Sequence, residues 1–156
     1  PSGTYDPDRN QMYFPLQHTC ETVTATLTEP SLDNLYGRFA RPADRPDGMP
    51  NPPNSIAAIS VESGATLWSY EQEAIMMSLM STGGDLIFGG DNNGRMKAIS
   101  KDSGEVLWEV NLGSTVSGYP TTFMVNGKQY LSVSTGRSLY AGATDANNLF
   151  VFALPD

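Results

Sequence analysis

The chain has 156 residues, a single cysteine and a formal net charge of −8, and it is long enough for one ordinary domain with a hydrophobic core. Only nine lysines and arginines are present, so nucleic acid is not expected as a partner, because binding to a phosphate backbone needs clustered basic side chains. No apolar run approaches the roughly 18 residues of a membrane span, so we expect no membrane-spanning segment.

Three consecutive segments of the chain predict short β-strands separated by turns that contain Gly and Asp. The first segment predicts strands at 2–5, 10–15, 56–60 and 65–70. The second predicts strands at 75–80, 85–88, 95–99 and 105–110. The third predicts three strands, at 116–125, 129–134 and 148–154. Four short strands are what one propeller blade contains, so the third segment lacks its fourth strand.

A repeat of eleven residues joins the first two segments. Residues 58–68 (AISVESGATLW) return forty positions later at 98–108 (AISKDSGEVLW), with seven identical positions and both tryptophans of the chain. A period near forty with a Gly turn in each unit is typical of β-propeller blades. We therefore predict an all-β propeller fragment with a blade at 1–70, a second blade at 74–110 and an incomplete last blade at 115–156.

The length of the chain does not allow a closed ring. At about forty residues per unit it holds roughly three blades, whereas propellers have about four to eight. We expect the chain to be part of a longer chain or to need a partner chain. A last blade that lacks a strand favours the C-terminal portion of a larger ring, because such rings often borrow that strand from the other end of the chain.

Two long connections interrupt the predicted blades. One covers 21–55 in the first blade and the other covers 137–147 in the last, both between a second and a third strand. The stretch 41–53 is so rich in proline that we expect a surface loop without regular structure. Because blade strands alternate in direction, both insertions and the start of the strand at 75–80 should lie on one face. That face is the predicted binding face.

The two tryptophans are interpreted as structural. Each indole can bury a large apolar area and offers one N–H that needs an acceptor, which suits a contact that locks a blade to its neighbour. Gly64 and Gly104, four positions before Trp68 and Trp108, leave room for close packing and for turns with positive φ. The aspartates at 6, 8, 85, 91 and 102 fall in turn contexts and are expected to be solvated turn residues.

The spacing Ala-x-Ser-x-x-x-Gly-x-x-x-Trp resembles the tryptophan-docking motif of quinoprotein alcohol dehydrogenases, the eight-bladed propellers that hold pyrroloquinoline quinone (PQQ). Relatives usually have Asp or Asn where Ser60 and Ser100 stand here, and non-enzymatic propellers share the motif. Further stretches resemble the same family in the same order and spacing, at 5–20, 81–95 and 126–130.

The resemblance implies contacts between this chain and the quinone. An amide just before the cysteine of the first stretch contacts the cofactor in relatives, and the candidates here are Gln17 and His18. Where methanol-type relatives place a tryptophan against the cofactor, this chain has Met76 and Met77. Leu139 and Tyr140 stand near another aromatic contact. The alternative is that Gln17 and His18 satisfy loop backbone groups, and that the methionines are ordinary strand core.

The same resemblance implies an activity and its limits. Relatives are periplasmic enzymes that oxidise alcohols with PQQ and Ca²⁺ and pass electrons to a cytochrome c or a similar acceptor. Their catalytic aspartate and their calcium ligands lie on preceding blades, so we expect no catalytic or metal-binding residue in this chain, and no activity from it alone. Cys20 is then free or paired with a cysteine outside the chain.

Two other functions remain open from the sequence. One is a non-catalytic propeller scaffold that binds protein partners through the same loop-rich face. The other is a three-blade protein that closes a ring by self-association, which the unequal loops and the incomplete last blade disfavour.

Overall fold

The computed structural model describes residues 2–25, 38–42, 46–136 and 146–153. Thirteen strands lie in this part of the chain, arranged as three sheets and one separate hairpin. Among the described residues there is no helix that is long and apolar enough to cross a membrane.

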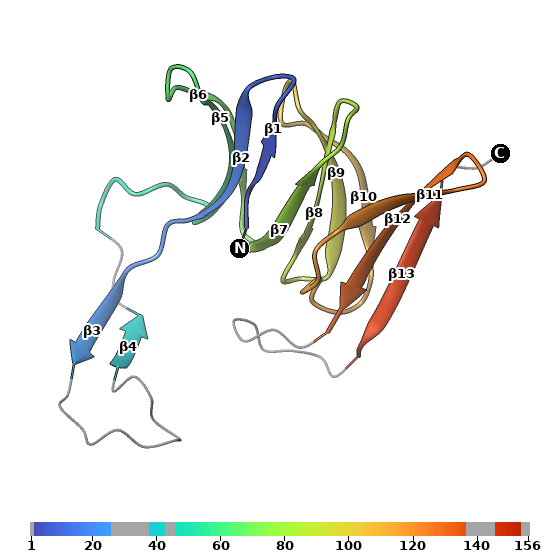
Figure 1. The fold of residues 1–156 in the computed structure, drawn as a ribbon. Coiled ribbons are helices and arrows are strands. Elements are labelled where there is room, and N and C mark those ends of the chain that lie inside the picture. Colours follow the sequence, from blue (N-terminus) through green and yellow to red (C-terminus); the bar gives the residue numbers. More distant parts are fainter. Residues whose placement is uncertain (1, 26–37, 43–45, 137–145, 154–156) are drawn as a thin grey trace.

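The first sheet has the strand order β1-β2-β5-β6 and contains β1 (Thr4–Asp6), β2 (Gln11–Gln17), β5 (Asn54–Ser60) and β6 (Thr66–Gln72). The second sheet has the order β7-β8-β9-β10 and contains β7 (Met76–Ser81), β8 (Leu86–Asp91), β9 (Arg95–Ser100) and β10 (Val106–Asn111). The third has the order β11-β12-β13 and contains β11 (Thr121–Val125), β12 (Lys128–Thr135) and β13 (Asn148–Ala153). Neighbouring strands are antiparallel, and the sheets stand side by side in chain order (Figure 1). The predicted propeller fragment of about three blades is confirmed.

Two hydrophobic cores hold the three sheets together. Alternation along the strands directs one set of apolar side chains to each side of a sheet. The core between the first and second sheets contains Tyr13, Ile56, Ala58, Met76, Leu79, Ile87 and Ile99. The core between the second and third sheets contains Met96, Leu112, Val116, Leu131 and Val133. The second sheet is therefore packed on both faces, as a blade within a propeller is.

No other sheet of the described residues packs on the outer faces of the first and third sheets. The large apolar side chains exposed on the first sheet include Tyr5, Met12, Leu16 and Leu67. Those on the third sheet include Phe123, Val125, Leu149 and Val151. Leu149 is 71% exposed and Val151 52% exposed, which is unusual for two apolar residues on one strand. Both outer faces have the character of surfaces that another sheet covers.

The segment 21–55 differs from the predicted loop. Residues Glu21–Ala25 (β3) and Arg38–Pro42 (β4) pair as an antiparallel hairpin, and β5 begins at Asn54. Threonine and valine alternate in β3 and favour an extended strand, whereas Pro42 is tolerated because it stands at the end of an edge strand. The strand predicted from 116 begins only at Thr121. The residues before it cross from β10 to β11.

The two ends of the sheets differ in the connections they carry. We call one end the loop edge: second strands end there and third strands begin there, as in the paired residues Gln17 and Asn54. The long connection with β3 and β4 leaves from this edge, at the lower end of the sheets in Figure 1. We call the opposite end the turn edge, because short turns such as 7–10 and 101–105 lie there.

Candidate functional site

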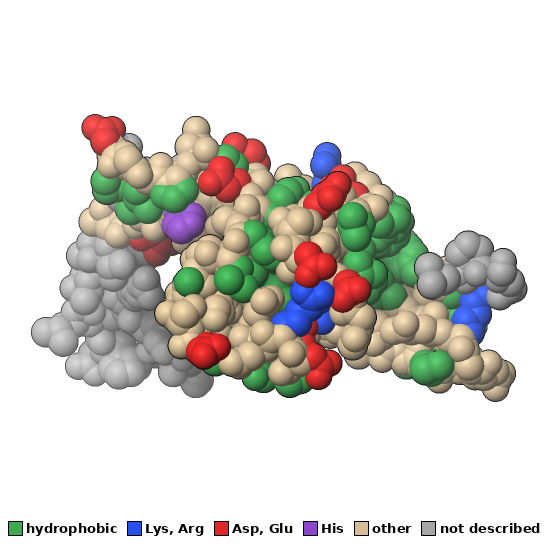
Figure 2. All heavy atoms as spheres, turned by 90° about the horizontal axis from the view of Figure 1, so that it is seen from above, with side chains coloured by type: hydrophobic (Ala, Val, Ile, Leu, Met, Phe, Trp, Pro, Cys, Tyr) green, Lys and Arg blue, Asp and Glu red, His purple; other side chains and the backbone are tan. Residues whose placement is uncertain are grey.

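Gln17 and His18 lie at the loop edge, where β2 gives way to the insertion. Gln17 is the last residue of β2, pairs with Asn54 and has an exposed side chain. The backbone N–H of His18 donates to the carbonyl of Pro53 at 2.8 Å, which closes the neck of the insertion. The backbone at this position is therefore fixed. The imidazole is the purple side chain visible at the surface in Figure 2, and the Gln17 amide is likewise free to meet a ligand.

The predicted methionines lie at the start of β7. Met76 is 2% exposed and its side chain packs in the core between the first two sheets, where Tyr13 and Leu79 also lie. Met77 falls at an irregularity of the ladder between β7 and β8, because Met76 pairs with Asp91 and Ser78 with Gly90. A bulge of this kind redirects one side chain at the end of a strand. The backbone carbonyl of Met77 accepts a hydrogen bond from the N–H of Ser2 at 3.1 Å.

Leu139 and Tyr140 fall outside the described residues. Cys20 carries a free thiol, and its Sγ lies 3.7 Å from Sδ of Met49 on the far side of the insertion. Among the described residues, no three His, Cys, Asp or Glu side chains come together as a metal site would require. The loop edge therefore offers amide, imidazole and hydroxyl groups.

Sequence reasoning missed four polar side chains at the loop edge. The Oγ of Ser2 and the phenolic oxygen of Tyr119 are 3.0 Å apart and join the first sheet to the start of the third. Asn54 donates from Nδ2 to the carbonyl of Glu73 at 2.7 Å, yet its buried Oδ1 has no partner among the described residues. The buried Oγ1 of Thr135 is also without one. Tyr119 and Pro120 fell inside the strand predicted at 116–125, and a proline inside a predicted strand was the available signal that the strand begins later.

A buried ion pair on the second sheet corrects the expectation for Asp91. Lys97 Nζ lies 2.9 Å from Asp91 Oδ2 and donates to Gln72 Oε1 at 3.0 Å, so it joins the second sheet to β6. Asp91 is fully buried rather than solvated, and its Oδ1 accepts the backbone N–H of Arg95 at 2.9 Å. Each charged group in this contact has a partner, so we assign it a structural role.

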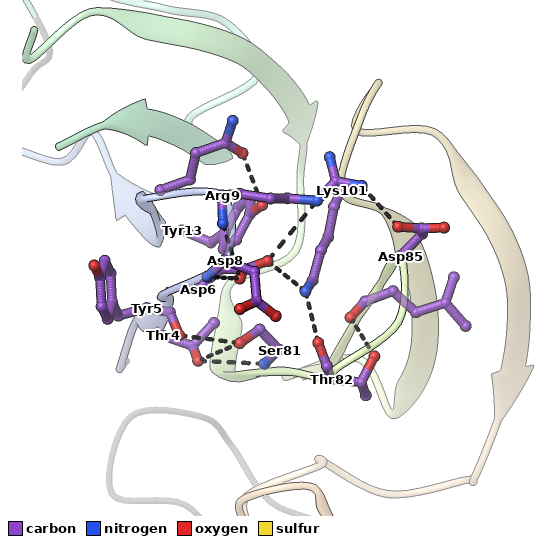
Figure 3. Close-up of polar contacts among 12 residues, drawn as sticks. Thr4, Tyr5, Asp6, Asp8, Arg9, Tyr13, Ser81, Thr82, Asp85 and Lys101 are labelled. Atoms are coloured by element: carbon purple, nitrogen blue, oxygen red, sulfur yellow. Dashed lines mark hydrogen bonds and ion pairs between the residues drawn. The ribbon is translucent and has the colours of Figure 1, made fainter. Parts of the chain in front are cut away.

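A second polar cluster ties the first two sheets at the turn edge (Figure 3). Lys101 Nζ lies 2.5 Å from Asp6 Oδ2, and both side chains are buried. Burial favours the neutral carboxyl, but hydrogen bonds from Lys101 and from the backbone N–H of Arg9 outweigh it and hold the pKa of Asp6 below its usual range. Asp6 is thus a second buried exception to the expected solvated turn residues. The guanidinium of Arg9 pairs with Asp85 at 2.7 Å and also with Asp102.

The repeat itself supplies a third contact between the same sheets. Trp68 donates from Nε1 to the carbonyl of Lys101 at 2.8 Å. A Cβ on Gly104 would lie only 2.6 Å from the Trp68 ring, so the indole rests directly on the glycine backbone. The Asp6–Lys101 and Trp68 contacts lie at the turn edge, whereas the Asp91–Lys97 pair lies near the loop edge but is buried and paired. The chemistry that is free to meet a ligand is therefore at the loop edge.

Residues 71–131 match the family described as the β-propeller domain of glucose, ethanol and alcohol dehydrogenases, named for PQQ. The quinoprotein ethanol dehydrogenase of Pseudomonas aeruginosa is 33% identical over 89% of this chain. The chain belongs to the PQQ-dependent dehydrogenase propeller family. Subunit 1 of the methanol dehydrogenase of Methylobacterium organophilum is 28% identical over 85% of the chain. The chain spans about a fifth of these relatives, 22% in both cases.

Solved structures of PQQ-dependent dehydrogenases have the same fold. A europium-containing methanol dehydrogenase superposes with a TM-score of 0.77 at 24% identity, over 90% of this chain and 24% of its own. The quinohemoprotein alcohol dehydrogenase of Comamonas testosteroni superposes with a TM-score of 0.76 at 22% identity, over 97% of this chain and 25% of its own. The three sheets thus have the fold of an arc of these propellers.

Proposed function

We propose that this chain works as part of an eight-bladed, periplasmic PQQ-dependent alcohol dehydrogenase and supplies part of the wall of the quinone pocket. The observation that carries the proposal is the match to a quinoprotein ethanol dehydrogenase over 89% of the chain. When bound, the quinone would supply the electron acceptor for oxidation of the alcohol, and a cytochrome c or a similar acceptor would take up the electrons.

The side chains at the loop edge fit the chemistry of the quinone, which presents carbonyl and carboxylate oxygens around a flat ring. These oxygens need donors, and the Gln17 amide, the His18 imidazole and the Thr135 hydroxyl can donate. Thr135 Oγ1 is buried at this edge without a partner among the described residues, as a group that awaits a ligand or a water would be. Met77 offers a polarizable thioether for the ring face.

The other three residues predicted to contact the quinone are proposed for different reasons. Met76 is a contact that the family resemblance favours, whereas its place in the core favours a packing role. Leu139 and Tyr140 rest on the resemblance alone. The catalytic aspartate and the ligands of Ca²⁺ would come from blades outside this chain, so the chain would orient the quinone and exclude water from one side of it.

The remainder of the ring is the partner that this proposal requires. Trp68 sits on Gly104, whereas nothing in the described chain lies within 4 Å of a Cβ on Gly64, the equivalent glycine of the first copy. Trp108, the equivalent indole of the second copy, is 38% exposed beside a cavity of about 810 Å³ between the second and third sheets. The open space at Gly64 favours a blade before the first sheet, and the partly exposed Trp108 favours the missing fourth strand of the last blade.

The full-length protein that contains this chain provides the test. It would be loaded with PQQ and Ca²⁺, bound quinone would be followed by absorbance, and dye reduction would be assayed over a panel of alcohols. We expect bound quinone, alcohol-dependent dye reduction, and about a tenfold loss of quinone affinity in Gln17→Ala. Gln129→Ala is the matched control, because Gln129 is an exposed glutamine in β12 at the turn edge.

Two results would contradict the proposal. A protein that neither retains the quinone nor turns over any alcohol would not be a PQQ-dependent dehydrogenase. Such a protein, if it captured a protein partner through the loop edge, would instead be the non-catalytic scaffold.

A further inference from the structure

Tyr119 lies at the loop edge, just before the first strand of the third sheet and in contact with Ser2 before the first strand of the first sheet. The first residues of the first and second sheets meet there, because Ser2 forms a parallel bridge with Ser78. Two backbone hydrogen bonds make the bridge, from Ser2 N–H to Met77 C=O at 3.1 Å and from Leu79 N–H to Ser2 C=O at 3.0 Å. The phenolic oxygen of Tyr119 reaches Oγ of Ser2 at 3.0 Å. The starts of all three sheets therefore converge at this one place.

The strand pairings place Tyr119 at the same end of the third sheet as the predicted methionines of the second sheet. On the second sheet Ser78 pairs with Gly90, the residue before the last of β8. On the third sheet Gly118 N–H donates to the carbonyl of Ser134, the residue before the last of β12, which holds 118–119 beside that position. Gly118 thus stands at the level of Ser78, and Tyr119 follows it at the same end of the third sheet.

The backbone around Tyr119 is tightly held. A Cβ on Gly118 would lie 2.0 Å from Oγ and 3.1 Å from Cβ of Ser134, so a side chain there would displace the Ser134 hydroxyl and crowd its Cβ. Pro120 follows directly and restricts the φ angle at its own position. The Tyr119 side chain is nevertheless 65% exposed, and the described chain gives it one side-chain hydrogen bond, to Ser2. The aromatic ring is therefore held at its base and at its hydroxyl, while most of its surface is exposed among the described residues.

We propose that Tyr119 forms an aromatic wall of the quinone pocket, held in place by Ser2. The ligand class is a flat aromatic o-quinone that carries carboxylates, and an aromatic ring beside such a plane contributes through offset or edge-to-face contact. The phenol can accept from Ser2 and donate to an oxygen of the ligand, or the reverse. This proposal rests on the proposed function, because it takes the loop edge to be the quinone face.

The test compares two exposed tyrosines at opposite edges of the same molecule. Tyr5 is 47% exposed, lies in β1 and donates from its hydroxyl to Asn10 Oδ1 at 3.0 Å at the turn edge, so Tyr5→Ala is the matched control. Full-length protein would be titrated with PQQ, and affinity would be read from quinone absorbance and equilibrium dialysis. The melting temperature without the quinone would be recorded for each variant.

We expect Tyr119→Ala to weaken PQQ binding about three- to tenfold, with Tyr5→Ala unchanged. Tyr119→Phe and Ser2→Ala keep the ring but remove the hydrogen bond, so each should weaken binding less than Tyr119→Ala does. Unchanged affinity in Tyr119→Ala, with normal binding by the unsubstituted protein, would overturn this proposal and leave the proposed function standing. Equal losses in Tyr119→Ala and Tyr5→Ala would overturn it as well. Failure of the unsubstituted protein to bind PQQ would overturn the proposed function, and this proposal with it.

Discussion

Gly104 shows how one residue controls the distance between two sheets. Its φ is +74°, and a Cβ there would lie 2.6 Å from the Trp68 ring. We expect Gly104→Ala to destabilise the protein by about 1–2 kcal/mol through the left-handed backbone and by about 1–3 kcal/mol more through overpacking. Gly127 has φ +80° with nothing within 4 Å, so Gly127→Ala isolates the backbone contribution. Urea unfolding of both variants gives the difference, and equal losses would contradict a close contact with the indole.

Single residues also show what a sequence pattern can miss. Asp6 and Asp91 stand in turn contexts and read as solvated, yet each is buried beside a lysine. The partner lysines are 95 and 6 positions away, and neither pairing follows from local spacing. Tyr119 was missed for the same reason, because its partner Ser2 lies 117 positions away and belongs to another sheet.

At the scale of elements, strand alternation and the eleven-residue repeat predicted nearly all strands of the three sheets. These signals are local, since they reflect which side chains face a core and where a turn must form. The β3–β4 hairpin was not predicted, because a long connection separates its two strands and because the neighbouring prolines favoured a loop. The place of Met76 in the core likewise depends on how the first sheet packs against β7.

The contact between the first and second sheets makes a prediction about pH. Asp6→Asn leaves Lys101 buried without its counter-ion, so we expect a loss of about 3–5 kcal/mol at neutral pH. Because the pKa of Asp6 is lowered in the folded protein, the ion pair contributes fully above about pH 4 and is lost as the pH falls below that value. The stability difference between the unsubstituted protein and Asp6→Asn should therefore shrink on acidification.

Denaturant unfolding at several pH values would measure that difference. Asp8→Asn serves as the control, since Asp8 lies exposed in the same turn. A difference that stayed constant from neutral pH to below pH 4 would show that the Asp6 charge does not stabilise the sheet contact.

At the scale of the whole molecule, the repeat predicts what lies beyond the first sheet. Gly64 and Gly104 hold equivalent places in the two copies, with φ of +71° and +74°. Only Gly104 has an indole on it within this chain. If the first sheet continues into a ring, the preceding blade should place a side chain on Gly64 and cover Met12 and Leu67, which are exposed here.

This expectation separates a ring from an isolated three-sheet unit. In the full-length protein we expect Gly64→Ala to cost as much as Gly104→Ala, because both alanines would push against a neighbouring blade. In a protein without that neighbour, Gly64→Ala would cost only the backbone strain seen in Gly127→Ala, because no described residue lies within 4 Å of a Cβ at either position. Urea unfolding of the three variants decides between the two. A loss for Gly64→Ala that matched Gly127→Ala would mean that no blade packs against the first sheet.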